Sequence, residues 1–261
     1  MLRKGDLTQG GIITTLLQFT LPMLAGSLLQ QCYNIADTLI VGQCIGANAL
    51  AAVGSAYTLM VFLISILLGL SMGSGTVFSL QYGAGDLSAL RRSIYVSFLL
   101  IGTVTILLNV AVFLWLDPIL RWLQVPYDIY SLMRNYLWII FWGIVFTFLY
   151  NFYAALLRAV GDSVTPLWFL AVSVVLNIGL DLFLILVLDQ GIEGAAVATV
   201  IAQGTAASGI LLYTYKIRPE LRLHREDMRF DRSSLREITS FSTLTCVQQS
   251  VMNFGILMVQ G

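Results

Sequence analysis

The sequence predicts an all-α integral membrane protein, in which a bundle of six transmembrane helices is followed by one further helix. Hydrophobic residues make up 58% of the 261 residues and charged residues only 11%, with a mean hydropathy of +0.85. A soluble domain has about 25% charged residues. Long apolar runs recur along the chain, and the basic residues fall mostly between them. A water-soluble core could not bury this much apolar surface, so the lipid bilayer is the expected solvent.

The apolar runs give the number of helices. A membrane-spanning helix needs about 20 mostly apolar residues. The first run is too long for the apolar part of a signal peptide, so it is predicted to be the first membrane helix. Pro22 lies within it and predicts a kink or hinge there. The runs are at 14–41, 49–80, 93–116, 132–157, 167–188 and 194–215, with a seventh at 238–261 that we expect to be incomplete.

The loop charges predict the orientation. If the N-terminus is cytoplasmic and the chain crosses the membrane at each run, twelve of the fourteen Lys and Arg residues lie inside. Only Arg121 and Arg134 then lie outside, as the positive-inside rule requires. We therefore expect a multi-pass protein of the cell (plasma or inner) membrane. It divides into a six-helix unit at 1–215, a charged cytoplasmic loop at 216–237 and the last run at 238–261.

Several functional classes are disfavoured by composition. A net charge of zero gives no general attraction to nucleic acid. His224 is the only histidine and the three cysteines show no CxxC spacing, which argues against a metal centre or a catalytic triad. Asp86 completes a GxGD sequence typical of intramembrane proteases, but it falls in a loop and no membrane run has a Tyr-Asp partner. Neither an enzyme nor a bound cofactor is expected.

Two acidic residues lie inside the apolar runs, Asp37 in the first and Asp181 in the fifth. A carboxylate in the middle of a bilayer costs about 2.5–3.5 kcal/mol and usually faces a bundle interior or a watery cavity. Both helices run outward and both residues lie in their outer parts, so the two carboxylates could line one cavity. There they could hold a proton or a cation. Two other interpretations stay open: a structural carboxylate satisfied by neighbouring amides, and an Asp37 at the membrane interface.

Polar side chains accompany these carboxylates at helical spacing. Asn34 and Asp37 are three residues apart, and Asn177 and Asp181 are four apart, which places each pair on one helix face. Carboxylate, amide and hydroxyl oxygens suit a hard cation such as Na⁺. We expect the substrate cavity to be lined by further polar residues of the first, fourth and sixth runs: Gln30, Asn34, Tyr150 and Gln203, with Asn151 and Thr199 beside them.

Five segments in this order resemble the multidrug and toxic compound extrusion (MATE) family. Each segment is rich in Gly and Ala and is weakly specific alone, but their order and spacing together are specific, and the resemblance covers essentially the whole chain. The segments are NIADTLIVGQCIGANALAAVG (34–54), GLSMGSGTVFSLQYGAGD (69–86), LLRAVGDSVTP (156–166), LNIGLDLFLI (176–185) and GIEGAAVATVIAQ (191–203).

The resemblance implies an antiporter of two six-helix lobes that exports organic cations or drugs in exchange for Na⁺ or H⁺. The chain then corresponds to the N-terminal lobe and the first helix of a second lobe, whose remainder is the expected partner. In some members the ion site of this lobe uses residues that match Asp37, Asn177, Asp181 and Thr199, with Asn151 as the candidate on the fourth helix. Some members have a carboxylate on the seventh helix, where this chain has Gln248 and Gln249.

Two other functions stay open. A related flippase of lipid-linked oligosaccharides needs a cationic cavity for pyrophosphate, and the interiors of these membrane runs contain no arginine. A channel or structural membrane protein would show no coupling of solute flux to a counter-ion.

Overall fold

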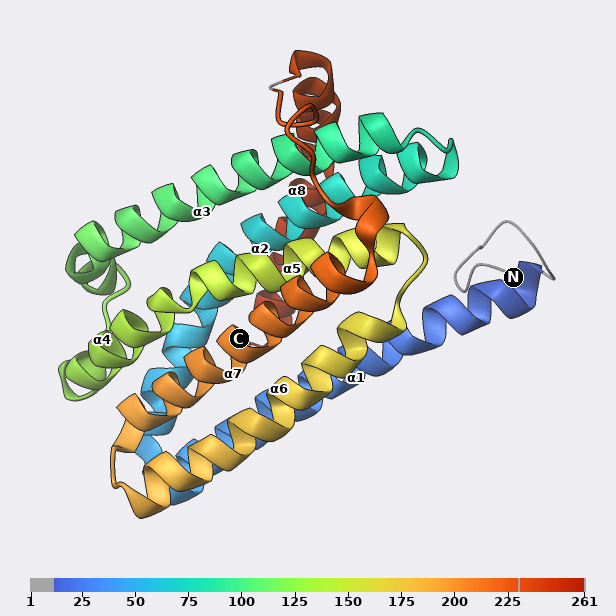
Figure 1. Cartoon of the computed structure of the whole chain (residues 1–261). Helices are drawn as coiled ribbons and strands as arrows, with labels where there is room; N and C mark the ends of the chain where they lie inside the picture. Colours follow the sequence, from blue (N-terminus) through green and yellow to red (C-terminus); the bar gives the residue numbers. More distant parts are fainter. Residues whose placement is uncertain (1–11, 230, 261) are drawn as a thin grey trace.

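The computed structural model describes residues 12–229 and 231–260, and within these ranges the regular structure is helical (Figure 1). The α-helices are α1 (Ile12–Cys44), α2 (Ala47–Gly83), α3 (Leu87–Trp122), α4 (Tyr127–Trp142), α5 (Ile144–Ala159), α6 (Val164–Leu182), α7 (Gly191–Ile217) and α8 (Arg232–Gln260). A π-helical turn, η1 (Phe183–Val187), continues α6, and a short 3₁₀ turn, η2 (Pro219–Leu221), follows α7.

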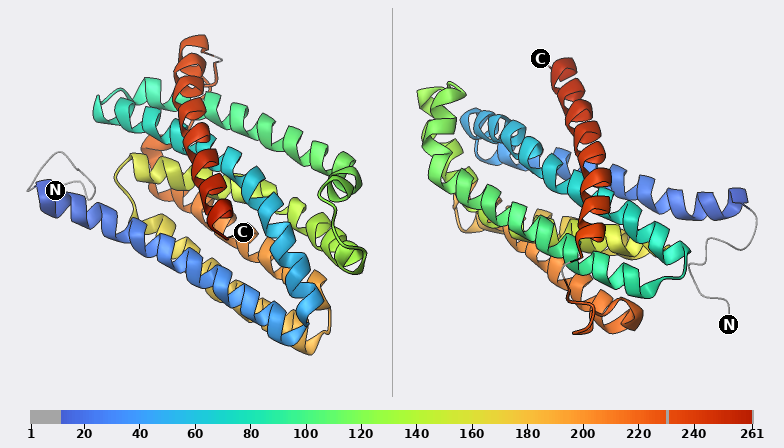
Figure 2. Two further views of the ribbon diagram at one scale, coloured as in Figure 1. Left: turned by 180° about the vertical axis from the view of Figure 1, so that it is seen from behind. Right: turned by 90° about the horizontal axis from the view of Figure 1, so that it is seen from above.

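The helices pack as long rods with short connections. α1 lies along α6, α7 packs between α6 and the α4–α5 pair, and α2 contacts the other side of α5 (Figure 1). α3 covers α2, and α8 crosses α2 steeply and rises away from the other helices (Figure 2). Several connections turn at glycines with positive φ, such as Gly85 (76°) after α2 and Gly161 (88°) after α5. Glycine reaches this conformation without steric cost.

Five helical spans are long and apolar enough to cross a membrane: Ile13–Cys44, Ala47–Gly83, Leu87–Trp122, Val164–Val187 and Gly191–Ile217. A sixth span forms if α4 and α5 are taken together, although the two are bent by 45° at Gly143. The six predicted runs therefore match the observed spans, except that the run at 132–157 is broken. The seventh run is also helical, as α8, but it does not meet the same test within the described residues.

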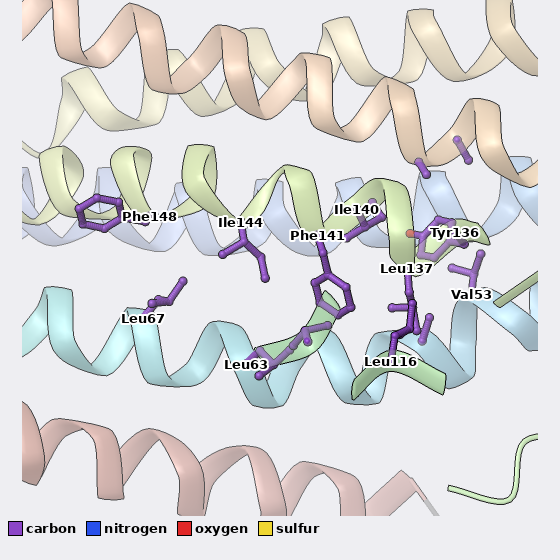
Figure 3. Packing of buried hydrophobic residues seen from close by; sticks show 14 of the residues in the cluster. Val53, Leu63, Leu67, Leu116, Tyr136, Leu137, Ile140, Phe141, Ile144 and Phe148 are labelled. Atoms are coloured by element: carbon purple, nitrogen blue, oxygen red, sulfur yellow. The ribbon is translucent and has the colours of Figure 1, made fainter. Parts of the chain in front are cut away.

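The buried core lies mainly between α2, α3, α4 and α5. Leu63 and Leu67 of α2 pack with Phe141 of α4 and Phe148 of α5, and Leu116 of α3 joins them (Figure 3). α1 contributes little to this core and is exposed along most of its length. The apolar faces that stay exposed are compatible with contact to lipid or to further helices, because lipid tails are as apolar as these side chains.

The crossing of α2 and α8 depends on small residues. A methyl group at Gly69 would lie 2.6 Å from the Cys246 backbone, and one at Gly73 would lie 2.4 Å from the Ser242 backbone. The Ser242 hydroxyl also donates a hydrogen bond to the carbonyl of Leu70 at 3.3 Å. Such close backbone approach is the usual role of Gly and Ser at four-residue spacing in membrane helices. Gly69 and Gly73 therefore allow the close packing of α2 against α8.

Ion pairs join the loops at one end of the bundle, which we call the basic end and define by the connections 84–86, 160–163 and 218–231. Arg218 reaches Asp162 at 3.3 Å, and Arg91 reaches Asp227 at 3.4 Å. The Asp162 carboxylate also accepts hydrogen bonds from the backbone and hydroxyl of Thr165, which fixes the start of α6. Ion pairs of Arg218 and Arg91 therefore tie the loops together at this end.

Candidate functional site

The two carboxylates within the membrane spans come together in space. Asp37 of α1 and Asp181 of α6 lie close enough for a direct interaction between their carboxyl groups. This follows from the parallel course of α1 and α6, which lie side by side along their length. Asp181 is fully buried, whereas Asp37 is half-buried on the exposed helix α1. The pair therefore lies between the buried interior of the bundle and its exposed side.

An amide and a hydroxyl complete the group around Asp181. Asn177 lies one turn earlier on α6, and Thr199 lies on the adjacent helix α7; both are buried. With the Asn177 amide in one orientation, its nitrogen donates to Asp181 Oδ2 at 3.0 Å and its oxygen accepts from the Thr199 backbone N–H at 3.3 Å. In the other orientation, its nitrogen donates to Thr199 Oγ1 at 3.3 Å. The first satisfies both amide atoms and is the one we adopt.

Two tyrosines belong to the same surroundings and were missed by the sequence analysis. The Tyr33 hydroxyl of α1 lies 3.3 Å from Thr199 Oγ1, so a hydrogen bond joins α1 to α7. Tyr136 of α4 is almost fully buried within electrostatic range of both carboxylates. Tyr33 could have been found, because it lies four residues before Asp37 on the same helix face. Tyr136 lies in an aromatic stretch with no spacing signal.

The charge of this site is not neutralised within the described part of the chain. No ion pair joins Asp37 or Asp181 to a Lys, Arg or His there, although five such contacts occur elsewhere. Each carboxyl group also has one buried oxygen, Oδ1, that accepts no hydrogen bond from the described residues. Within residues 12–229 and 231–260, no cluster of three or more His, Cys, Asp and Glu residues could hold a metal ion. The arrangement fits a proton or a hard monovalent cation shared by two carboxylates.

The residues expected to line the substrate cavity are more dispersed. Asn34 is half-buried and donates to Gln31 at 3.2 Å, whereas Gln30 is exposed. Both lie on α1 within two turns before Asp37, on the open side of the bundle. They are therefore accessible beside Asp37, and in the described part of the chain no hydrogen bond joins either of them to Asp181.

The expected polar residues of α5 form contacts away from the carboxylates. The Tyr150 hydroxyl donates to the carbonyl of Pro166 at 3.0 Å, near the start of α6. Asn151 donates to the carbonyl of Thr147 at 2.8 Å, one turn earlier in its own helix. Gln203 of α7 accepts a hydrogen bond from the Thr147 hydroxyl at 2.9 Å. Asn151 and Gln203 thus meet around Thr147, not around Asp181.

The predicted hinge at Pro22 lies about three helical turns into α1. The helix is continuous through this residue, from Ile12 to Cys44. Proline lacks the backbone N–H and weakens a helix locally, and a hinge at this residue stays a prediction.

Comparison with known proteins gives the family. Residues 22–183, more than half of the chain, match the family model described as MatE. The chain is 37% identical over 211 residues to the probable multidrug resistance protein YpnP of Bacillus subtilis, covering 81% of this chain and 47% of that protein. It is 28% identical over 251 residues to the multidrug export protein MepA of Staphylococcus aureus, covering 93% of this chain and 54% of that protein. The chain spans about half the length of the curated relatives it matches.

Solved structures show the same fold. An outward-facing multidrug resistance MATE family transporter of the MOP superfamily superposes with a TM-score of 0.91 at 23% identity, covering 98% of this chain and 57% of that one. A MATE protein in complex with MaL6 gives a TM-score of 0.92 at 22% identity, covering 99% and 58%. The MATE resemblance of the five sequence segments is therefore confirmed, and the chain, an all-α membrane protein, belongs to the MatE family of transporters.

Proposed function

We propose that this chain forms the cation-coupled N-terminal lobe of a secondary transporter that exports organic cations in exchange for Na⁺ or H⁺. Members of the family are transporters and not enzymes. Two of the relatives carry names that refer to multidrug resistance or multidrug export. Because those relatives are about twice as long, we further propose that export requires a second lobe.

The observation that carries this proposal is the unneutralised pair Asp37 and Asp181. A charged pair without a fixed positive partner is costly within a membrane. Binding a mobile cation or a proton removes that cost, and release restores it. Coupling requires that one conformation of the lobe hold the cation more tightly than the other does. In that case, entry of the cation down its gradient supplies free energy for export of the substrate. Asn177 and Thr199 supply the additional oxygens, and Asn151 stays a proposed member of the site.

The proposed orientation has the basic end in the cytoplasm of the producing cell, with the N-terminus on the same side. The distribution of Lys and Arg residues supports this. The carboxylates then lie toward the outer half of the membrane, and their cavity would open between this lobe and its partner. Gln30 and Asn34 on the exposed face of α1 are the proposed contacts for substrate.

The test is efflux of a cationic dye from cells that express either this chain or the chain continued through any downstream coding sequence. Sodium and pH gradients are imposed separately. We expect export only from the longer form, driven by one of the two gradients. Equal export by the short chain would contradict the need for a second lobe. No export by either form under any gradient would contradict the drug-export proposal, and a lipid-linked oligosaccharide would be tested next.

A further inference from the structure

The bend between α4 and α5 is built from specific polar contacts. At Gly143 the backbone N–H donates to Ile140, three residues back, at 2.8 Å. The Asn109 side chain of α3 donates to the neighbouring carbonyl of Phe141 at 2.8 Å. Sharp helix bends occur where a side chain enters the backbone hydrogen-bond ladder. The bend of 45° is therefore supported from a second helix.

Helix α7 presses directly against this bend. A methyl group at Gly143 would lie 3.1 Å from both Gln203 Oε1 and Val200 Cγ2, and 3.0 Å from the carbonyl of Ile140. Only glycine leaves room for this approach without displacement of a neighbour. Any rotation or shift of α7 near Val200 must consequently change the packing at the bend.

One hydroxyl group at the bend has two acceptors. Thr147 Oγ1 lies 2.9 Å from Gln203 Oε1 on α7 and 3.2 Å from the carbonyl of Gly143 in its own helix. A hydroxyl has a single proton. Its donation can move from α7 to the helix carbonyl without leaving a buried donor unpaired, which would cost about 1–3 kcal/mol. Gln203 is only half-buried, so its oxygen can be solvated when the contact opens.

The face of α7 that carries Gln203 also contacts the carboxylate site. Gln203 follows Thr199 by four residues, one helical turn, so the two side chains lie on one face. The Thr199 hydroxyl contacts Tyr33 of α1, and the Thr199 backbone N–H donates to the Asn177 amide of α6, which in turn donates to Asp181. One turn of α7 therefore touches the carboxylate site at one end and the bend at the other.

We propose that Gln203 is a positioning residue that ties the Asp37–Asp181 site to the bend at Gly143. Binding of the cation at the carboxylates changes the contacts of Thr199 and shifts this turn of α7. The Gln203–Thr147 hydrogen bond then forms or opens, and the angle between α4 and α5 changes with it. This inference rests on the proposed cation site. It assigns Gln203 to conformational coupling, in place of the direct contact with substrate expected from the sequence.

The experiment measures amide hydrogen exchange across residues 140–148 in the whole chain reconstituted in lipid nanodiscs. Sodium chloride is compared with choline chloride, and two pH values are compared after correction for intrinsic exchange. Occupancy is followed independently, by calorimetry for sodium and by the infrared band of the protonated carboxyl group for protons. We expect the occupying ion to change exchange at the bend by about fivefold or more.

Variants distinguish the proposed coupling through Gln203 from ion binding at Asp37 and Asp181. Gln203→Leu and Thr147→Val should keep ion binding and lose the exchange response, while Thr147→Ser, which retains the hydroxyl, should restore it. Thr205→Val is the matched control, because the Thr205 hydroxyl bonds only to Ile201 within α7. Ion binding with no exchange response in the unmodified chain would overturn this inference alone. The absence of both ion binding and carboxyl protonation changes would overturn the proposed cation site together with it.

Discussion

Buried carboxylates occur in two contrasting regions of this molecule. At the basic end, Asp162 and Asp227 face Arg218 and Arg91, so each charge is paired within the fold. In the membrane spans, Asp37 and Asp181 face each other, and no described Lys, Arg or His pairs with them. A paired carboxylate holds parts of a protein together, whereas an unpaired couple can respond to a mobile cation. The same side chain thus has a structural task in one region and a proposed functional task in the other.

The largest effect expected from this contrast is on coupling. Asp37→Asn or Asp181→Asn in the transport-competent form should reduce gradient-driven dye export by at least about tenfold, because the amide carries no charge to be neutralised. Asp162→Asn is the matched control at the basic end and should leave the response to the gradient in place. Export that persists in both membrane-span variants, at normal levels in the membrane, would refute the assigned role.

A smaller effect is expected from the uncharged part of the site. Thr199→Val removes the hydroxyl that contacts Tyr33, and it should weaken cation binding by about tenfold, or about 1.4 kcal/mol. Thr199→Ser keeps the hydroxyl and should bind within about threefold of the original chain. Sodium calorimetry measures both. Equal affinities for the Val and Ser variants would show that the hydroxyl is not a ligand.

At the basic end the expected effect is on stability. The Arg218 and Asp162 side chains are 20% and 12% exposed, so their pair is partly shielded from water. A double-mutant cycle with Arg218→Ala and Asp162→Ala should give an interaction energy of about 1 kcal/mol. Thermal unfolding in detergent measures it. Additive single-variant effects, with no interaction energy, would show that the Arg218–Asp162 pair does not stabilise the fold.

The last effect is expected at a half-buried carboxylate beside the start of α8. Asp231 precedes α8, and hydrogen bonds from Ser233 and Ser234 lower its pKa from 3.8 to about 2. Asp231→Ala should loosen the first turn of α8 and cost about 1 kcal/mol.

The pH dependence of this last effect has a definite sign. Because the pKa is lowered in the folded chain, the stabilisation by Asp231 is complete above pH 4 and is lost as the pH falls through about 2. Circular dichroism of the original chain and of Asp231→Ala across this range measures it. A difference that grows as the pH falls would contradict the assigned hydrogen bonds.

The sequence was sufficient for the spans, and it singled out two carboxylates that the structure brings together. Long apolar runs and loop charges are local properties, and they located the helix ends to within about six residues. Asp37 and Asp181 stood out because a carboxylate in an apolar run is costly. Their i, i+4 and i, i+3 neighbours followed from helix geometry, and Asn177 does lie beside Asp181.

Other features depend on contacts between helices and could not be predicted in this way. The run at 132–157 has no proline, so its sequence did not predict a bend at Gly143. The bend depends on contacts with Asn109 and α7. The placement of Asn151 and Gln203 around Thr147 also depends on which face of α5 meets α7. Composition alone did not identify Tyr136, because a buried tyrosine in a membrane helix is ordinary until its neighbours are known.

The π-helical turn at Phe183–Val187 follows Asp181 almost directly. A π turn has one more residue than an α turn of the same kind, and such insertions are frequent beside functional sites. It therefore accommodates one extra residue between Asp181 and the connection to α7. Deletion of one residue within 183–187 is expected to restore a regular helix and to keep the orientation of both Asp181 and the connection to α7, because the wide turn accommodates the extra residue. In evolutionary terms, this turn would let the segment between α6 and α7 change in length by one residue without displacing the buried Asp181 carboxylate.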